Sequence, residues 1–211
     1  MEIFERRLDR FKSVISKRQD DLVIVLENIW DPHNIGAIFR SCDSVGVHRV
    51  FIVNTDPKLQ TEKTYARLSS ASGASKWLQL SFYETVEEAV SELRSQEFKI
   101  LTTHLSSEAS SMYDIDFTGR IALAFGNEHA GISEQLLELS DGNVIIPQYG
   151  MVQSLNISVA CAVCLFEISR QRNIKGQYDL SFDESKQSHL DLFEKYKSIH
   201  TEKKLKGRKN S

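Results

Sequence analysis

Short runs of apolar residues alternate along the chain with segments whose apolar residues recur at helical spacing. The strand-like runs cover residues 22–26, 49–53, 77–82, 98–103, 120–125 and 143–146. Helical spacing is found at about 33–45, 84–96, 133–139 and 154–172. Because strands that alternate with helices build parallel sheets, the pattern predicts an α/β fold with a mostly parallel sheet flanked by helices on both faces.

Amphipathic helices are predicted at both ends of this alternating region. One covers residues 3–17, and the other begins near residue 183 and is expected to end at Gly207. The predicted organisation is an N-terminal basic helical extension (1–20), a core domain (21–175) and a C-terminal helical extension with a basic tail (176–211). Residues 54–76 contain four serines and one glycine and are expected to form a small-residue loop that can either move or contact a partner.

Three of the predicted strands run directly into polar loops. The loops begin after residues 26, 125 and 146, and two helix starts are marked by Asp31-Pro32 and by Ser133. In open α/β sheets, ligands bind beyond the carboxyl ends of the strands, so the three loops are predicted to form one site. Ser154 and Asn156 lie at the predicted start of the helix that follows the third loop. Ordinary helix capping is the alternative explanation for their presence there.

Charge is unevenly distributed along the 211 residues. The formal net charge is −3, but residues 1–18 carry six Lys/Arg against three Asp/Glu, and residues 200–211 carry five against one. Basic ends on an acidic body can hold a phosphate backbone. The candidate RNA contacts are Arg6, Arg7, Arg10, Lys203 and Lys204, with a solvated tail as the alternative for the last two.

Composition narrows the class of protein further. No apolar run is long enough to cross a membrane, and the N-terminus lacks the apolar centre of a signal peptide, so a cytoplasmic location and no membrane partner are expected. Cys161 and Cys164 lie among apolar residues and are expected to pack in the core with Cys42. No metal is expected, because the histidines lack ligand spacing.

The three polar loops together resemble the three motifs of the SpoU, or TrmH-like, branch of the SPOUT RNA methyltransferases. The matching stretches read Asn-Ile-Gly-Ala-Ile-Phe-Arg (34–40), Phe-Gly-Asn-Glu-His-Ala-Gly-Ile-Ser (125–133) and Ile-Pro-x-x-Gly-x-x-x-Ser-Leu-Asn-Ile-Ser-Val-Ala (146–160). They occur in order and cover residues 22–170. The flanking basic helices look most like the subgroup that methylates guanosine 18 of tRNA.

The resemblance implies a SPOUT fold with a C-terminal deep trefoil knot, a homodimer with the active site at its interface, and S-adenosylmethionine as cofactor. The sequence has no Gly-x-Gly-x-x-Gly, so a Rossmann-type cofactor site has no support. By resemblance, Thr103, Gly126, Ile146 and Leu155 contact the cofactor. A glycine after a strand also allows close backbone approach to a ligand, with a plain turn as the alternative.

The resemblance assigns the reaction to Arg40, Asn34, Glu128, Ser154 and Asn156. Arg40 is the residue assigned to activating the ribose 2′-hydroxyl. Because a guanidinium is normally unable to accept a proton, we expect Arg40 to bind the neighbouring phosphate and lower the pKa of the hydroxyl. Glu128 is expected to neutralise cationic charge, and Asn34 to bridge loops. By spacing alone, Arg40 can be a surface residue, and Asn34 and Glu128 can be turn residues.

The predicted function is S-adenosylmethionine-dependent methylation of a tRNA ribose 2′-hydroxyl, at guanosine 18 of the D-loop. Three alternatives stay open. One is an rRNA ribose methyltransferase, the second is a non-catalytic RNA-binding protein on the same scaffold, and the third is a phosphate-handling hydrolase that uses helix N-termini. The hydrolase alternative is the weakest, because the sequence contains no nucleophile–base pair at a recognisable spacing.

Overall fold

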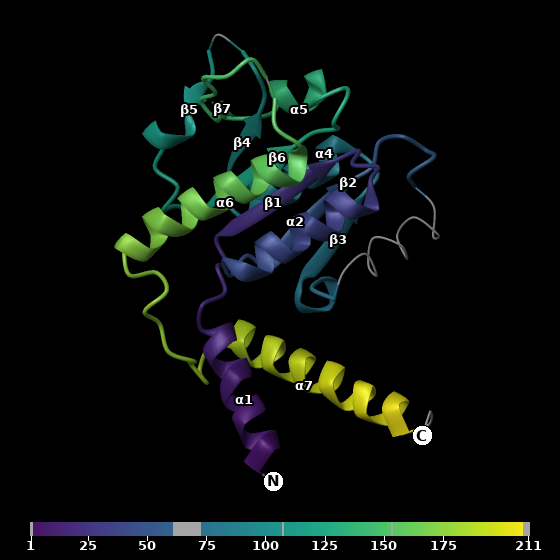
Figure 1. The fold of residues 1–211 in the computed structure, drawn as a ribbon, viewed down its shortest axis with the longest axis vertical. Coiled ribbons are helices and arrows are strands. Elements are labelled where there is room, and N and C mark those ends of the chain that lie inside the picture. The colour runs from purple at the N-terminus through teal and green to yellow at the C-terminus, as the bar shows by residue number, and fades with distance from the viewer. Residues whose placement is uncertain (1, 61–72, 107, 153, 209–211) are drawn as a thin grey trace. The chain divides into compact units, whose positions relative to one another are not determined.

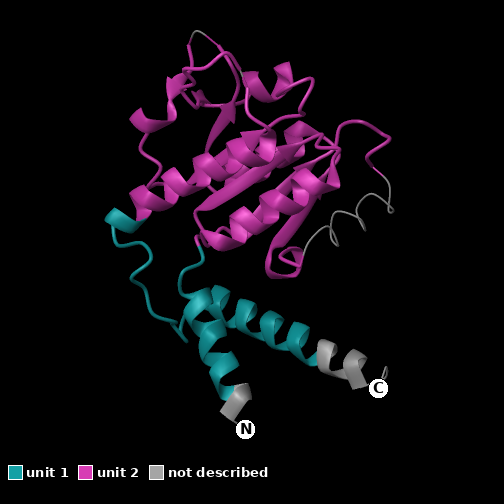
Figure 2. Ribbon diagram, viewed as in Figure 1, with its two compact units in different colours: residues 1–18, 173–211 teal, residues 19–172 magenta. Residues whose placement is uncertain are grey.

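The computed structural model describes residues 2–60, 73–106, 108–152 and 154–208, and within these ranges the side chains of residues 5–201. The chain divides into two compact units (Figure 2). One consists of Gln19–Arg172, and the other of Met1–Arg18 together with Asn173–Ser211. The larger unit contains all three polar loops of the predicted site.

The larger unit is built on a seven-stranded sheet in which every described strand pair is parallel. In the order β3-β2-β1-β6-β4-β7-β5, its strands are Gln79–Tyr83, Arg49–Val53, Leu22–Glu27, Ile121–Phe125, Lys99–Thr103, Gly142–Ile145 and Ser110–Ser111. The predicted parallel α/β sheet is confirmed, although the two-residue β5 was not expected. β1 and β6 are neighbours and β7 lies beyond β4 in the same parallel sheet, so the three polar loops that follow β1, β6 and β7 leave the sheet at the same edge.

Helices cover both faces of the sheet (Figure 1). Helices α2 (Pro32–Ser44) and α6 (Ile157–Ile174) pack on the face that carries Leu22, Ile24 and Leu26. Helices α4 (Val86–Ser95) and α5 (Glu134–Glu138) pack on the opposite face, which carries Val23 and Val25. Alternate residues of one buried strand therefore supply both cores. Short 3-10 turns lie at Ser75–Trp77 and Met112–Asp114.

The predicted helix starts at Asp31 and Ser133 are confirmed. The Asp31 carboxylate accepts a hydrogen bond from the His33 N–H, and Pro32 occupies the first turn of α2. The Ser133 hydroxyl accepts from the Leu136 N–H. The same hydroxyl donates a hydrogen bond to the carboxylate of Glu27 at the end of β1. This bond ties the start of α5 to the sheet.

Helix α6 begins at Ile157, so the predicted start at residue 154 is wrong. The Asn156 side chain accepts hydrogen bonds from the N–H and hydroxyl of Ser158, and its carbonyl accepts from the Ala160 N–H. Asn156 is therefore the capping residue, and Ser154 lies in the preceding loop.

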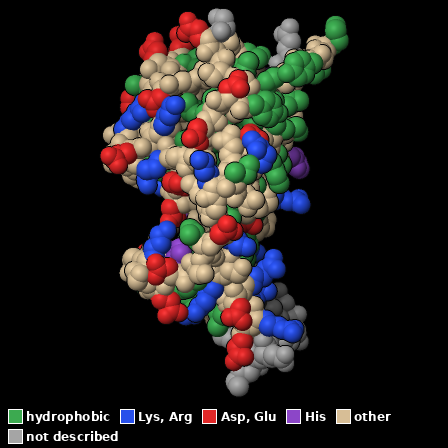
Figure 3. Space-filling view, turned by 90° about the vertical axis from the view of Figure 1, so that its left-hand side faces the viewer, with side chains coloured by type: hydrophobic (Ala, Val, Ile, Leu, Met, Phe, Trp, Pro, Cys, Tyr) green, Lys and Arg blue, Asp and Glu red, His purple; other side chains and the backbone are tan. Residues whose placement is uncertain are grey.

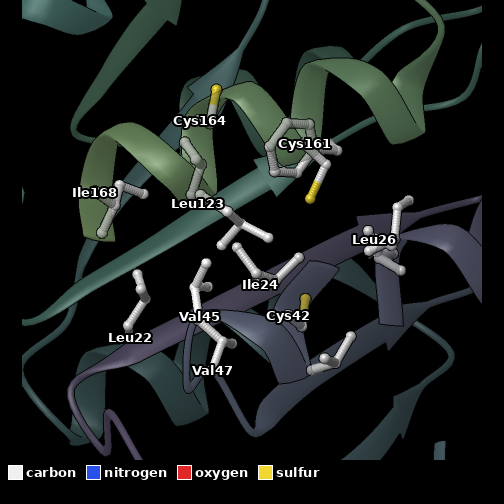
Figure 4. Close-up of a cluster of buried hydrophobic side chains, with 14 of the residues drawn as sticks. Leu22, Ile24, Leu26, Cys42, Val45, Val47, Leu123, Cys161, Cys164 and Ile168 are labelled. Atoms are coloured by element: carbon white, nitrogen blue, oxygen red, sulfur yellow. The ribbon is translucent and has the colours of Figure 1, made fainter. Parts of the chain in front are cut away.

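The three cysteines are free and buried in the core between α2, α6 and the sheet (Figure 4). Burial among apolar side chains raises the pKa of the Cys161 thiol, and it raises that of Cys164 to about 12. The prediction that these cysteines pack in the core is confirmed.

A fully buried arginine near the end of α6 was not anticipated from the sequence. The Arg172 guanidinium donates to the Gln19 side chain, to the carbonyl oxygens of Phe117 and Gly119, and to the Asp21 carboxylate. Because a buried cation is costly unless it is paired and hydrogen-bonded, these partners explain its place in the core.

The smaller unit contains α1 (Glu2–Ile15) and α7 (Gln187–Arg208). The Phe11 ring meets the Tyr196 ring edge to face at 5.6 Å, and the Arg18 guanidinium donates to the Tyr196 hydroxyl at 2.7 Å. The expected helical break at Gly207 is wrong, because α7 continues to Arg208, and it begins at Gln187 instead of near 183. No described helix has the length and apolar character of a membrane span.

Candidate functional site

Two of the three polar loops, those after β6 and β7, meet the loop after β4 in a cavity of about 530 Å³ at the carboxyl ends of the strands, which we call the strand-end cavity. The loop after β1 lines a neighbouring cavity instead. The walls of the strand-end cavity come from residues 103–105 after β4, 125–131 after β6, 144–146 and 148 at and after β7, and 154–157 with Ala160 at the start of α6. All four predicted cofactor contacts line it: Thr103, Gly126, Ile146 and Leu155. Their contact with the cofactor stays a prediction.

Gly126 lines the strand-end cavity and is also packed tightly against its own loop. A Cβ at this position would lie 2.2 Å from the carbonyl carbon and oxygen of Gly131. The loop after β6 therefore folds back onto its own first residue, and the Asn127 carbonyl accepts from the Gly131 N–H at 2.8 Å. Gly131 itself has a φ of 73°, a conformation that favours glycine. The fold of this loop therefore requires glycine at both positions: Gly126 has no room for a Cβ, and Gly131 has a positive φ.

Three predicted catalytic residues form a continuous hydrogen-bonded network at the rim of the cavity. The Asn156 amide donates to the Asn34 side-chain oxygen at 3.1 Å, and the Asn34 amide donates to the Glu128 carboxylate at 2.7 Å. Asn34 is on α2, Glu128 follows β6, and Asn156 caps α6. The network therefore joins all three motifs, which are up to 122 positions apart in the sequence.

The direction of this network follows from the backbone. The Ser158 N–H is a fixed donor, so Asn156 must turn its oxygen toward α6 and its NH₂ group toward Asn34. Asn34 then presents its own NH₂ group to Glu128, which must accept. A carboxylate is the natural end of such a chain, because when ionised it is an acceptor only.

Arg40 lies away from the strand-end cavity of its own chain. It is exposed on α2 and lines a separate hollow with Pro32, His33, Gly36, Ala37, Gly73 and Ala74. Asn34 and Arg40 are six positions apart, so at 3.6 residues per turn they point about 120° apart around the helix. Within the described part of one chain, Glu128, Ser154 and Asn156 line the strand-end cavity and Asn34 is hydrogen-bonded to two of them, but Arg40 is in neither arrangement.

One residue of the cavity was missed by the sequence analysis. The Gln148 Oε1 atom is buried, lines the cavity and has no hydrogen-bond partner among the described residues. A buried, unpaired acceptor is costly unless a ligand supplies a donor. S-adenosylmethionine carries two amino groups that can donate, so the cavity's chemistry fits this cofactor. Gln148 lies within the third motif, but it occupies an unspecified position there, so the sequence pattern did not identify it as a site residue.

The predicted RNA contacts lie in the smaller unit. Arg6, Arg7 and Arg10 are exposed on α1. Lys203 and Lys204 fall in the helical part of α7, but their side chains lie outside the described residues. Within the described part of the chain, no group of three His, Cys, Asp or Glu side chains is placed to hold a metal ion.

The parallel α/β sheet and the three motifs that this network joins agree with the class that the sequence resembles, the SPOUT methyltransferases. Residues 21–166 match the model of the SpoU rRNA Methylase family. A relative from Escherichia coli (strain K12), named tRNA (guanosine(18)-2'-O)-methyltransferase, is 40% identical over 82% of this chain and 73% of its own length. The chain belongs to the SpoU rRNA methylase family.

Solved structures agree with this assignment. The TrmH/SpoU tRNA modifying enzyme of A. aeolicus has a TM-score of 0.79 and 32% identity, covering 93% of this chain and 98% of its own. The SpoU methyltransferase AviRb from Streptomyces viridochromogenes, in complex with AdoMet, has a TM-score of 0.64 and 28% identity, covering 74% of this chain and 59% of its own. The predicted fold class and family are confirmed.

Proposed function

We propose that this protein transfers a methyl group from S-adenosylmethionine to the ribose 2′-hydroxyl of guanosine 18 in tRNA. The observation that carries the proposal is the network of Asn34, Glu128 and Asn156 at the rim of the strand-end cavity. The 40% identical relative from Escherichia coli is named for this reaction and supports the choice of substrate. As the family resemblance implies, we also expect the knotted form of the SPOUT fold.

The proposed site would hold the cofactor through its walls and the ribose at its rim. Thr103, Gly126, Ile146 and Leu155 would surround the cofactor, and Gln148 would accept a hydrogen bond from one of its amino groups. When bound, S-adenosylmethionine supplies an electrophilic methyl group on a sulfonium. Asn34, Asn156 and Ser154 would position the hydroxyl, and positioning alone can contribute several kcal/mol to the lowering of the barrier.

The proton of the 2′-hydroxyl needs a destination as the oxygen–methyl bond forms and the sulfur–methyl bond breaks. We propose that Arg40 binds the phosphate beside the target ribose and lowers the pKa of the hydroxyl, with the proton passing to phosphate or solvent. An Arg40→Lys variant tests the planar, bidentate contact. It should lose much of kcat, whereas full activity would show that charge alone is sufficient.

Because Arg40 lies outside the cavity of its own chain, we propose that a second copy supplies it. The exposed apolar side chains at the start and outer face of α6 and in the preceding loop suit such an interface: Tyr149, Met151, Val152, Leu155, Val159 and Phe166. Figure 3 shows hydrophobic side chains gathered on one side of the larger unit. Burying a patch of this kind is the usual basis of a stable homodimer.

Mixing two inactive variants tests the shared site. Neither Arg40→Ala nor Asn156→Ala protein should be active alone. After equal amounts are unfolded and refolded together, half of the dimers carry one of each chain, and each has one intact site, so about a quarter of the wild-type activity should return. Absence of any recovery, with mixed dimers demonstrated by native mass spectrometry, would place Arg40 and Asn156 in the same chain's site.

The substrate is tested with labelled methyl donor and either bulk tRNA or rRNA fragments. Methylation of tRNA at guanosine 18, mapped by mass spectrometry, supports the proposal. The family's description favours rRNA as the second candidate, and label in rRNA alone would select it. RNA binding without transfer would indicate a non-catalytic protein. We also propose that the protein works in the cytoplasm, where bulk tRNA is found.

A further inference from the structure

A second cavity, of about 740 Å³, lies beside the strand-end cavity and has no part in the proposed cofactor site. It opens at the ends of β1 and β2 and above the start of α2. Its wall includes four carboxylates, from Glu27, Asp31, Asp56 and Glu128. We call it the acidic cavity.

The acidic cavity and the strand-end cavity share one wall, which is the loop of residues 127–131. Asn34 lines the acidic cavity, its partner Asn156 lines the strand-end cavity, and Glu128 lines both. The catalytic network therefore lies on the boundary between the two. A ribose held at this network has the cofactor on one side and the acidic cavity on the other.

The charges around the acidic cavity exclude some ligands and favour others. Among the described residues, its lining contains neither Lys nor Arg, so it is unsuited to a phosphate. Asp56 uses one carboxylate oxygen to accept from the Lys58 N–H, and within the described part of the chain its other oxygen has no recorded partner. Such an oxygen can accept hydrogen bonds from a neutral ligand that carries N–H donors.

Trp30 gives the acidic cavity an aromatic surface. Its side chain lines the cavity and is 50% exposed, although Ile29, the residue before it, is buried. Large indole rings are usually well buried, and a half-exposed one in a cavity wall offers a flat face on which a nucleobase can stack.

The loops that carry Trp30 and Asp56 are held together by Asn28. Asn28 has a φ of 52°, and its side-chain oxygen accepts from the Thr55 N–H at 2.9 Å. Its side-chain amide donates to the Thr55 hydroxyl, and its own N–H donates to the Val53 carbonyl. The indole and the carboxylate therefore belong to one cross-linked pair of strand ends, which suits a preformed site.

We infer that the acidic cavity is the pocket for the target nucleobase, which stacks on Trp30 and donates its Watson–Crick N–H groups to Asp56. A guanine presents two neighbouring donors on this edge, N1–H and the 2-amino group, and a carboxylate is their complement. This inference rests on the proposed function, because it assumes that a ribose binds at the network. It assigns base selection to residues outside the three motifs.

Steady-state kinetics test this inference with tRNA transcripts whose target base is guanine or hypoxanthine, which lacks the 2-amino group. Trp30→Ala should raise KM for tRNA about five- to 150-fold, as expected for a lost stacking partner, whereas the ring-preserving control Trp30→Phe should stay near wild type. The wild type should prefer guanine about tenfold or more, and Asp56→Asn should reduce that preference. Affinity for S-adenosylmethionine should not change in any variant.

Fluorescence gives a readout that does not depend on catalysis. The chain has two tryptophans, so Trp77→Phe leaves Trp30 as the only indole and Trp30→Phe leaves Trp77. A D-arm stem-loop RNA should quench the first protein and not the second. The same RNA with an abasic target ribose should not quench either. Quenching that persists with the abasic RNA would refute the stacking on Trp30.

The two proposals fail in different ways. If the wild type transfers no methyl group to tRNA, the proposed function is wrong, and the fluorescence pair still decides whether a base stacks on Trp30. If the wild type methylates guanosine 18 while Trp30→Ala and Asp56→Asn keep the wild-type KM and base preference, the function stands and the nucleobase pocket is refuted.

Discussion

Replacing Gly126 by alanine adds a single methyl group where the structure has no room for it. The new Cβ would lie 2.2 Å from the Gly131 carbonyl carbon and oxygen, and 2.3 Å from the Ile132 nitrogen. All three are backbone atoms, so no side chain can turn away to relieve the clash. The loop of residues 127–131 must move instead, and this loop is the wall shared by the strand-end and acidic cavities.

The expected cost is at the upper end of the range for overpacking, about 3 kcal/mol. For a chain of this size, that loss should lower Tm by about 6–12 °C. The displaced wall should also weaken binding of S-adenosylmethionine by about tenfold or more, since 1.4 kcal/mol corresponds to a factor of ten. Differential scanning calorimetry and isothermal titration calorimetry measure the two effects separately.

Gly119→Ala is the matched control. A Cβ at Gly119 would meet no atom within 4 Å, and its φ lies outside the left-handed region. This variant should keep its affinity for S-adenosylmethionine and be as stable as the wild type or slightly more so, because alanine restricts the unfolded chain. If Gly126→Ala and Gly119→Ala behaved alike in both measurements, the argument that Gly126 is required by the contact with Gly131 would be wrong.

Further outcomes are expected from other parts of the larger unit. Asn156→Asp keeps the cap on α6 but loses the donor to Asn34, so kcat should fall about tenfold or more while circular dichroism stays unchanged. Burial acts to raise the pKa of Asp141, but hydrogen bonds from Arg94 and the Ile100 N–H outweigh it and leave that pKa below its ordinary value of 3.8. The Tm advantage of the wild type over Asp141→Asn should therefore be complete well above pH 3.8 and decline as the pH falls through the lowered pKa of the folded state; an advantage that grew on acidification would contradict this. The buried thiols of Cys42, Cys161 and Cys164 should react with a thiol reagent at pH 8 only after unfolding, and rapid labelling of the native protein would show that the core is open.

Local chemistry made several features predictable from the sequence. Asp31-Pro32 and Ser133 mark helix starts, because a side-chain oxygen in front of the first turn satisfies an orphan N–H in any context. Apolar runs with no polar alternation, such as residues 22–26, indicate strands buried on both faces. Because ligands of parallel sheets bind beyond the strand ends, the convergence of the three loops was also predictable.

Contacts between distant residues required the tertiary structure. No local pattern places Arg172 in the core, since its burial depends on oxygen atoms of segments more than 50 positions away. The exclusion of a side chain at Gly126 was not predictable either, because the atoms that exclude it belong to Gly131 and Ile132.

Local patterns were enough to predict the longer strands, the helix starts at Asp31 and Ser133 and the three motifs, because each depends on a few neighbouring residues. Only the tertiary structure decided that Asn34, Glu128 and Asn156 bond to one another while Arg40 points elsewhere, and that Trp30 and Asp56 line the same cavity. Direction and distance between side chains on different elements are set by how the helices pack on the sheet, and no local pattern encodes that packing.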